Sequence, residues 1–388
     1  MRYLHLKTNV IKNFIIYNSV QEFPKEWDCI AQKNIFLTTS YLLVLEKSAP
    51  KNMTCHFIGF FKNNELVAIC VTQFLNLNLV NPFGKKETIL KTLAINFLLK
   101  NYCSHILFVG NNMLTGQNAF AKLETITTNE LFENLKHAVE DLKLKFKATK
   151  INIHLTVFKD FDLQTSVKIS PFLKDYYKFS TQPNMIFTIP KNWKKEDDYV
   201  TALLKKYRDQ YKRAKKKMEG VEKHKLTLED IKKENEIIYN LYHHVVLNAS
   251  FNTFFLEKNH FYELKKSLGE HFLFYGYFIK GKMIGFNTLI KNKEAMDTYF
   301  LGYDDVFQRD KMLYLNMLYD MIAYSIKKRF CTIIFARTAL EIKSSVGANP
   351  VEMVGFIKHS NPFINKVIRQ LFNYFEPKTK WNKRNPFK

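Results

Sequence analysis

Residues 59–68 read GFFKNNELVA, and residues 276–285 read GYFIKGKMIG. Each stretch is apolar, then briefly polar, then apolar again. The polar centres, Asn63-Asn64 and Lys280-Gly281, are residue pairs that favour tight β-turns. Each stretch is therefore predicted to be an antiparallel β-hairpin. Because the pattern occurs twice, the chain is expected to contain two copies of one structural unit.

The segments around the two hairpins repeat as well. Helical segments come before both hairpins, and a helix followed by a strand comes after both. The preceding helices are predicted at 36–47, 228–248 and 259–268, and the later units at 129–147 with 151–157 and 313–328 with 331–335. This order predicts an α+β fold in which each half is a mixed sheet flanked by helices.

A domain boundary is expected near Pro183–Pro190, just before a long helical stretch. We therefore place an N-terminal domain at 1–190 and a C-terminal domain at 191–375. Residues 376–388 (EPKTKWNKRNPFK) are rich in cations and contain two prolines, so we expect a loose basic tail.

The composition favours an anionic partner. Lys and Arg number 59 against 36 for Asp and Glu, a formal net charge of +23 over 388 residues. Such a field attracts nucleic acid, phosphorylated metabolites, CoA-type cofactors or an anionic membrane. A lysine-rich solvated surface is the alternative explanation.

Several common kinds of site are not supported. The sequence has no GxGxxG, Gly-Lys-Ser/Thr, HExxH or GxSxG motif, which argues against dinucleotide-binding folds, P-loops, zincins and α/β-hydrolases. The five cysteines are scattered without a CxxC, so we expect no metal. The N-terminus lacks the apolar core of a signal peptide, and no apolar run approaches the roughly 18 residues of a membrane span. We expect a cytoplasmic protein, either free or peripheral at the inner membrane surface.

A strongly basic helix is predicted at about 195–219. Its apolar residues fall on one stripe at helical spacing, and Gly220 is a natural stop. The rest of its surface carries cations, among which we select Arg208, Lys212 and Lys216 as a platform for an anionic substrate. A purely solvated surface helix is the alternative.

Two segments in the second half are candidates for chemistry. Strand 296–303 is followed by a polar loop at 307–312 and then by an apolar helix, an arrangement that can bind an anion at the helix N-terminus. Strand 331–335 runs into the polar, small-residue segment RTALEIKSSVGA at 337–348. Ligand crevices in α/β sheets favour the carboxyl ends of strands.

These segments resemble the GNAT superfamily of N-acyltransferases, and more narrowly its tandem members. The latter are the Fem-type peptidyltransferases of peptidoglycan cross-bridges and the "BioF2-like acetyltransferase" or "peptidoglycan biosynthesis/recognition" group. The likeness rests on 207–217, 280–285, 303–314 and 337–350, and for the first half on the repeated hairpin and 109–116. It implies two tandem GNAT-like (acyl-CoA N-acyltransferase) domains, the first one degenerate and the second one active.

The resemblance also implies where a donor would bind. In GNAT proteins the acyl-CoA lies between two splayed strands, with its pyrophosphate on an Arg/Gln-x-x-Gly-x-Gly/Ala loop. That loop maps to 308–313, where Lys311 and Leu313 replace the two glycines. Fem-type enzymes often lack the loop and take aminoacyl-tRNA as donor. The cofactor-binding residues expected on this basis are Gln308, Arg309, Lys311, Met312 and Arg337.

The expected reaction is attack of an amine on a thioester or ester, which needs a base, oxyanion donors and a proton source. We assign the base to Glu341, the proton donor to Tyr303 and the anion contact to Lys343 or Arg337. Further candidates are Asp297, Tyr299 and Asp304, although the tyrosines could equally be aromatic core.

Two functions remain open from the sequence. The first is an N-acyltransferase that moves an acyl or aminoacyl group from acyl-CoA or aminoacyl-tRNA to an amine, in cell-envelope synthesis for example. Neither donor would be a permanently bound cofactor. The second is a non-catalytic GNAT-fold module that binds tRNA, a lipid-linked precursor or an anionic membrane.

Overall fold

The computed structural model describes residues 13–81, 100–249, 251–375 and 381–388, with side chains omitted from 371 to 375. The predictions that concern the first twelve residues and residues 376–380 lie outside the described residues. The elements of the first half are β1 (Phe14–Tyr17), α1 (Trp27–Ala31), α2 (Thr39–Ser48), β2 (Met53–Lys62), β3 (Glu65–Asn76), β4 (His105–Val109), β5 (Phe120–Lys122), α4 (Thr128–Ala148), β6 (Leu155–Phe161), α5 (Leu163–Ile169) and β7 (Tyr177–Thr188).

The second half repeats this order. Its elements are α6 (Glu196–Ala202), α7 (Lys205–Lys217), β8 (Glu222–Lys225), α8 (Leu228–Lys233), α9 (Asn235–Val246), α10 (His260–Leu268), β9 (Phe272–Ile279), β10 (Lys282–Asn292), β11 (Ala295–Tyr303), α11 (Asp305–Lys311), α12 (Leu313–Lys327), β12 (Thr332–Ala336), α13 (Leu340–Ser345), β13 (Asn349–His359) and α14 (Pro362–Phe375).

Both predicted hairpins form. In the first, β2 and β3 are joined by Asn63 and Asn64 with φ of 52° and 66°. In the second, β9 and β10 are joined by Lys280 and Gly281 with φ of 48° and 76°. Positive φ at both central residues is the turn geometry that matches strand twist.

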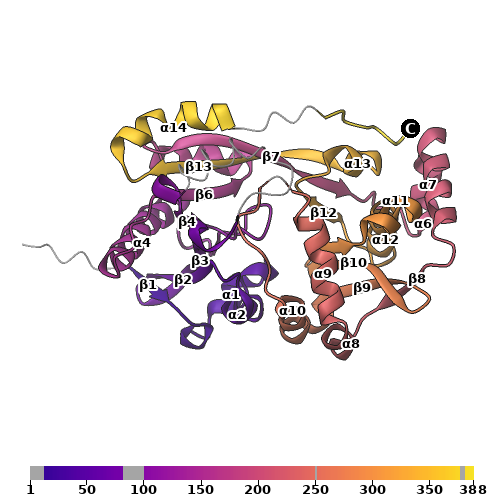
Figure 1. Ribbon diagram of the computed structural model, residues 1–388. Coiled ribbons are helices and arrows are strands. Elements are labelled where there is room, and N and C mark those ends of the chain that lie inside the picture. Colours follow the sequence, from indigo (N-terminus) through magenta and orange to yellow (C-terminus); the bar gives the residue numbers. More distant parts are fainter. Residues whose placement is uncertain (1–12, 82–99, 250, 376–380) are drawn as a thin grey trace, which may run out of the picture.

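The two halves exchange strands in one continuous sheet. Among the described residues the order is β1-β2-β3-β4-β6-β13-β7-β12-β11-β10-β9-β8, with β5 beside β3 (Figure 1). Strand β13 comes from the end of the second half but pairs with β6 of the first. Strand β7 comes from the first half but pairs with β12 of the second. The predicted domain boundary at 190/191 stays a prediction. One strand from each side of this boundary pairs with a strand from the other side.

Three apolar cores cover the sheet. One is shared between the halves and includes residues of α1 and α2 together with residues of α8, α9 and α10. Figure 1 shows α2 beside α10, where Ser48 Oγ lies 3.0 Å from His260 Nδ1. A second core packs under α4 and α5, and a third under α6, α7, α12 and α13. The shared core fixes the halves against each other.

The predicted helix at 195–219 is broken in the structure into α6 and α7. Leu203 forms a β-bridge with Phe387, and the Leu204 N–H donates to Pro386 O at 2.8 Å. That amide is thereby diverted from the helix, and the chain turns between Leu203 and Leu204. The stripe itself is confirmed, since Tyr199, Leu203 and Ala214 are buried.

The expectation of a loose tail is wrong for residues 381–388. The Phe387 ring packs 6.0 Å from Phe187, 5.7 Å from Trp193 and 5.9 Å from Tyr199, measured between ring centroids. Arg384 is ion-paired with Glu341. Aromatic burial therefore outweighs the tendency of a charged terminus to remain free.

The expected loop at 307–312 is also different. Residues Asp305–Lys311 form helix α11, capped by the Asp304 side chain, which accepts from the Val306 N–H. Met312, at φ 48°, joins α11 directly to α12. The capping aspartate explains why a helix begins at this point.

Candidate functional site

Strands β11 and β12 run parallel and then separate. They pair only from Ala295–Asp297 to Thr332–Ile334, and beyond Asp297 strand β11 pairs with β10 alone. The gap holds a cavity of about 180 Å³. Its lining consists of Met113, Leu114, Thr115, Asp297, Thr298, Tyr299, Phe300, Ile334, Ala336 and Arg337. Both halves of the chain therefore build this cavity.

Asp297 is the carboxylate of this cavity. It is only 9% exposed, and burial raises its pKa to about 7, an effect partly offset by a hydrogen bond from Asn292. Asn292 Nδ2 donates to Asp297 Oδ2 at 3.2 Å. A carboxylate with a pKa near neutrality can exchange a proton at physiological pH.

Tyr299 lies two residues further along β11, at a β-bulge. Its hydroxyl is 3.0 Å from His260 Nε2, and burial raises its pKa well above the usual range. The network continues through Tyr41, whose hydroxyl accepts from Asn111 Nδ2 at 3.2 Å. Burial lowers the pKa of His260 to about 4, so this histidine is neutral at physiological pH. Tyr299 is therefore held in a neutral hydrogen-bonded network.

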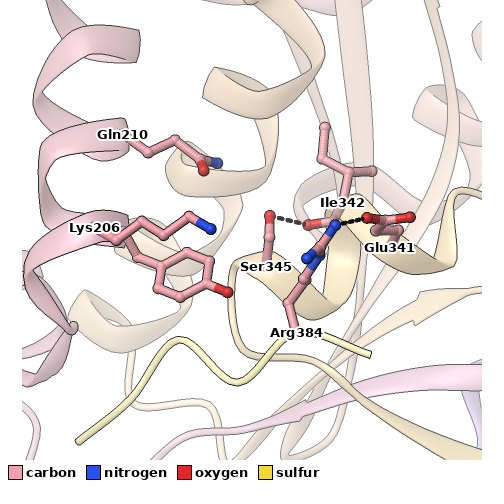
Figure 2. Close-up of a pocket in the computed structure, with 7 residues that line it drawn as sticks. Lys206, Gln210, Glu341, Ile342, Ser345 and Arg384 are labelled. Atoms are coloured by element: carbon pink, nitrogen blue, oxygen red, sulfur yellow. Dashed lines mark hydrogen bonds and ion pairs between the residues drawn. The ribbon is translucent and has the colours of Figure 1, made fainter. Parts of the chain in front are cut away.

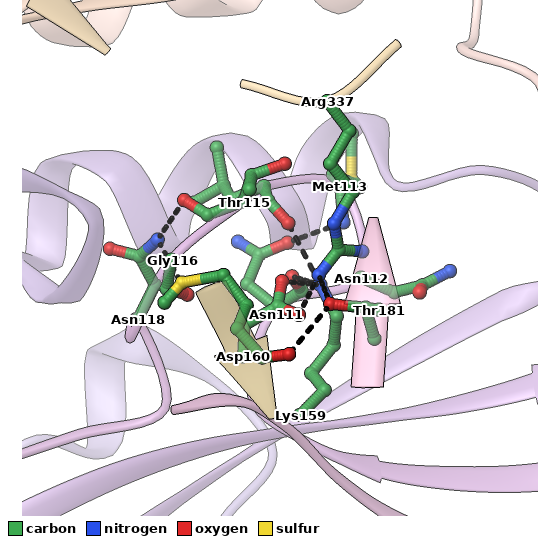
Figure 3. Close-up of polar contacts among 12 residues, drawn as sticks. Asn111, Asn112, Met113, Thr115, Gly116, Asn118, Lys159, Asp160, Thr181 and Arg337 are labelled. Atoms are coloured by element: carbon green, nitrogen blue, oxygen red, sulfur yellow. Dashed lines mark hydrogen bonds and ion pairs between the residues drawn. The ribbon is translucent and has the colours of Figure 1, made fainter. Parts of the chain in front are cut away.

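Arg337 brings a positive charge to the same cavity. Its Nε donates to Gln182 O at 3.2 Å, and its Nη2 donates to Thr181 Oγ1 at 2.9 Å and pairs with Asp160 (Figure 3). Burial lowers its pKa to about 10, so it remains charged. Its Nη1 forms no hydrogen bond with a described residue and is available to a ligand.

The corresponding gap in the first half is filled by a lysine. Strands β4 and β6 also run parallel, over Ile106–Val109 and Leu155–Phe158. Immediately beyond, Lys159 Nζ donates to Asn111 O at 3.1 Å and to Leu114 O at 2.8 Å (Figure 3). Burial and the nearby Arg337 lower the pKa of Lys159 well below its usual range. This lysine therefore lies where the first half corresponds to the cavity between β11 and β12 of the second half.

A second, larger cavity of about 450 Å³ lies between α7, α13 and the C-terminal segment (Figure 2). It is lined by Lys206, Tyr207, Gln210, Glu341, Ile342, Ser345 and Arg384. Figure 2 shows the Lys206 ammonium directed from α7 toward α13. Lys206 forms no ion pair with a described residue, whereas Glu341 is neutralised by Arg384. The cavity is therefore net positive.

The predicted catalytic residues are not brought together. Glu341 lines the second cavity and is ion-paired with Arg384. Lys343 is buried and donates to Ala336 O at 3.3 Å and Arg337 O at 2.5 Å, and it lines neither of these two cavities. Tyr303 ends β11, with its ring 6.3 Å from that of Tyr314. Their catalytic roles stay predictions.

The predicted cofactor-binding residues divide between two places. Gln308, Arg309 and Lys311 lie on α11, and Met312 links it to α12. Lys311 Nζ donates to Glu219 O at 3.3 Å, which ties α11 to the end of α7. Only Arg337 lines the cavity between the splayed strands.

The predicted anion platform lies on α7. Lys212 and Lys216 are exposed and Arg208 is half-buried. None of the three forms an ion pair with a described residue, whereas Lys215 of the same helix pairs with Asp320 and Glu196. The three cations are therefore free to meet an anion.

Sequence reasoning missed three residues of the site: Asn292, Lys159 and Asp160. Lys159 and Asp160 lie near the end of strand β6, which was predicted four residues too early, so that both fell just beyond the predicted strand at 151–157. A Lys-Asp pair near the end of an otherwise apolar strand is the signal that could have pointed to them. Asn292 carries no such signal, because an asparagine before a turn is common.

Among the described residues no group of three or more His, Cys, Asp or Glu side chains could hold a metal ion. The same part of the chain contains no helix that is both long and apolar enough to cross a membrane.

The comparisons with known proteins show the fold. No protein-family model matches the chain, and no curated protein sequence matches it. The structure of FemX is similar with a TM-score of 0.55 at 11% identity, covering 94% of this chain and 99% of that one. A tandem GNAT protein from the clavulanic acid biosynthesis pathway is similar with a TM-score of 0.50 at 8% identity, covering 90% and 98%. The chain therefore has the tandem GNAT fold, as the sequence predicted.

Proposed function

We propose that this chain is an acyltransferase, which moves an acyl or aminoacyl group from a phosphate-bearing carrier to an amine. The observation that carries the proposal is the cavity between β11 and β12, whose lining includes both an ionisable Asp297 and the charged Arg337. In a tandem GNAT fold, the gap between these splayed strands is the natural place for an acyl group. The first half contributes Met113, Leu114 and Thr115 to its wall.

The chemistry needs few groups. An amine arrives as an ammonium ion, and the ionised Asp297 takes one of its protons. The amine nitrogen then attacks the carbonyl carbon, and Arg337 Nη1 stabilises the negative oxygen that forms. The nitrogen of the tetrahedral intermediate still carries a positive charge and releases a second proton to solvent. When the carbon–oxygen or carbon–sulfur bond breaks, the protonated Asp297 gives its proton to the leaving group. The carboxylate ends in its starting state.

We favour aminoacyl-tRNA over acyl-CoA as the donor. The stretch where a pyrophosphate loop was expected is the helix α11, so it does not form a glycine-rich cradle of backbone amides. The free cations instead lie on the side chains of α7 and around the cavity beneath it. Side-chain cations along a helix suit the extended phosphate backbone of a nucleic acid. A role in cell-envelope synthesis, and a position at the inner membrane surface, stay predictions.

The test combines donors with a matched pair of variants. The protein is incubated with charged tRNA or with acyl-CoA esters and a panel of amines, and acylated products are measured by mass spectrometry. Asp297→Asn is expected to lower the transfer rate by about 10²–10⁴-fold. Asp310→Asn, which changes an exposed carboxylate on α11 in the same way, is expected to leave the rate unchanged.

The outcomes separate the functions. Transfer from acyl-CoA but not from charged tRNA would support the acyltransferase activity and refute the preference for aminoacyl-tRNA as donor. Salt-sensitive binding of tRNA without transfer from any donor would instead support the non-catalytic binding module, which the free cations of α7 also favour. Equal rates for Asp297→Asn and wild type would refute the assignment of the base.

A further inference from the structure

Three asparagine side chains connect the Asp297 carboxylate to the first half of the chain. Asn292 Nδ2 donates to Asp297 Oδ2 at 3.2 Å and to Asn34 Oδ1 at 3.5 Å. Asn34 Nδ2 donates to Asn118 Oδ1 at 2.9 Å. Asn118 Nδ2 then donates to the carbonyl oxygens of Thr115 and Gly116 at 3.2 and 3.3 Å (Figure 3).

The direction of every bond in this chain is fixed by backbone groups. The Ile35 N–H donates to Asn292 Oδ1 at 3.0 Å, so the amide nitrogen of Asn292 must face the carboxylate. The Phe36 N–H likewise donates to Asn34 Oδ1 at 3.1 Å. Carbonyl oxygens only accept, so Asn118 must turn its nitrogen toward residues 115 and 116.

Both ends of this chain meet at the same cavity. Asp297 and Thr115 are both part of its wall, one from each half. The three asparagines therefore form a chain of hydrogen bonds that links two parts of the cavity wall, one from each half. Asn292 stands at the end of β10, next to a tight turn with Lys293 at φ 55°, so its backbone position is well defined.

We propose that Asn292 is a positioning residue for the transfer reaction: held by the Ile35 N–H and by Asn34 of the first half, it orients the Asp297 carboxylate in the cavity. This inference rests on the proposed function of Asp297 as the base. It gives the first half a role in the site of the second half, although its own strand gap is filled by Lys159.

The consequence is an effect of Asn292 on proton affinity. A hydrogen bond to the ionised carboxylate favours that state, so removing the donor must raise the pKa of Asp297. The other charged or titratable groups near the carboxylate are Tyr299 of β11, Tyr41 of α2 and Arg337 after β12. All three remain in place in the variants below.

The experiment measures the titration of Asp297 directly. The full chain is labelled with ¹³C at aspartate carboxyls, and the Asp297 signal is assigned by its loss in Asp297→Asn. Asn292→Ala is expected to raise the midpoint by about one unit, a tenfold change in the protonation equilibrium. Asn292→Asp should raise it further, because it removes the donor and adds a nearby negative charge. Asn34→Ala should give a smaller shift in the same direction.

Asn112→Ala is the matched control. Asn112 belongs to the same loop as Thr115, and its Nδ2 donates to Thr253 Oγ1 of the second half at 2.9 Å. Its loss removes a bond between the halves without touching the asparagine chain, so no shift is expected. An unchanged midpoint in Asn292→Ala, or an equal shift in Asn112→Ala, overturns the inference.

This readout does not depend on turnover. If the midpoint shifts as expected but no donor supports transfer, the hydrogen-bond arrangement stands and the proposed function fails. If transfer depends on Asp297 but the titration midpoint of Asp297 is the same in Asn292→Ala as in wild type, the proposed function stands and the positioning role of Asn292 fails. If Asn292→Ala does not fold, Asn34→Ala provides the test. A shift of the Asp297 midpoint in that variant is expected only if the chain of hydrogen bonds reaches Asp297.

Discussion

Arg337 is ion-paired with Asp160, and the two residues occupy corresponding places in the two halves. Asp160 stands two residues before the N-cap of α5, and Arg337 stands two residues before the N-cap of α13. Both sites have a left-handed backbone nearby, with Asp160 at φ 65° and Ala336 at φ 58°. The pair therefore joins the halves at the ends of their equivalent strands β6 and β12.

This pairing predicts strong coupling between the two residues. Asp160 is fully buried, so Arg337→Met would leave its carboxylate with Lys159 alone, 2.8 Å away. Breaking a buried ion pair from one side costs about 3–5 kcal/mol. The double variant Arg337→Met with Asp160→Asn is expected to lose clearly less stability than the two single variants together, because the attraction between the two side chains can be lost only once. Asparagine also tolerates positive φ.

Urea unfolding of the four proteins measures this coupling. The expected result is a double-mutant cycle with an interaction free energy above about 1 kcal/mol. Additive losses would show that the pair does not hold the halves together.

The raised pKa of Asp297 predicts a pH-dependent stability. Its pKa is about 7 in the folded chain against 3.8 for the free residue, so folding favours the protonated form. This contribution is fully present below about pH 4, declines as the pH rises, and is lost above about pH 7. Each unit of pKa difference corresponds to roughly 1.4 kcal/mol, so the change should be measurable.

Thermal unfolding of wild type and Asp297→Asn across pH 4 to 8 tests this. As the pH rises, wild type should lose stability relative to Asp297→Asn, because only wild type must keep a buried carboxyl group protonated. A constant difference over that range would mean that Asp297 has an ordinary pKa in the folded chain.

The free cations of α7 predict salt-dependent binding of a polyanion. Lys212→Glu with Lys216→Glu is expected to weaken tRNA binding severalfold or more and to flatten its dependence on salt, since fewer counterions are then released. Lys232→Glu with Lys233→Glu on α8 makes the same change in net charge at exposed positions elsewhere. Filter binding at several salt concentrations compares the two; equal losses would indicate a general charge effect instead of a platform.

The docked C-terminal segment predicts a stabilising role for Phe387. A Cβ atom added to Gly347 would come within 2.4 Å of this ring, so the glycine makes room for it. Phe387→Ala is expected to lower stability by about 1–2 kcal/mol, less than for a fully buried phenylalanine because the ring is only half-buried. Lys383→Ala, an exposed neighbour, should change little, and denaturant melts distinguish the two.

Much of the local structure could be predicted from the sequence. The hairpin turns at Asn63-Asn64 and Lys280-Gly281, the helices at 129–147 and 313–328, and the apolar stripe of the basic helix all formed as expected. These features depend on residues close together in the chain, where periodicity and turn chemistry are decisive. Their order predicted a mixed sheet built twice, and the resemblance to the GNAT superfamily implied the tandem GNAT fold.

The site was less predictable, and the reason is physical. Asp297 was one candidate among several, and its environment depends on Arg337 and on residues 113–115, which lie far away in the sequence. The predicted roles of Glu341 and Lys343 came from their position after a strand, which says nothing about which side of α13 each faces. A pKa depends on burial, and burial is set by packing between distant elements.

The sequence by itself determined two repeated units, their helices and hairpins, and a strong positive charge, because each follows from local pattern or composition. Only the tertiary structure decided the exchange of β7 and β13, the docking of Phe387 against Tyr199 of α6, and the chain of asparagines that reaches Asp297. Strand β7 contains Pro183 and many polar residues, so its sequence pattern does not predict a central strand. Its partner β13 lies more than a hundred residues later, and pairing over such a separation has no local signature.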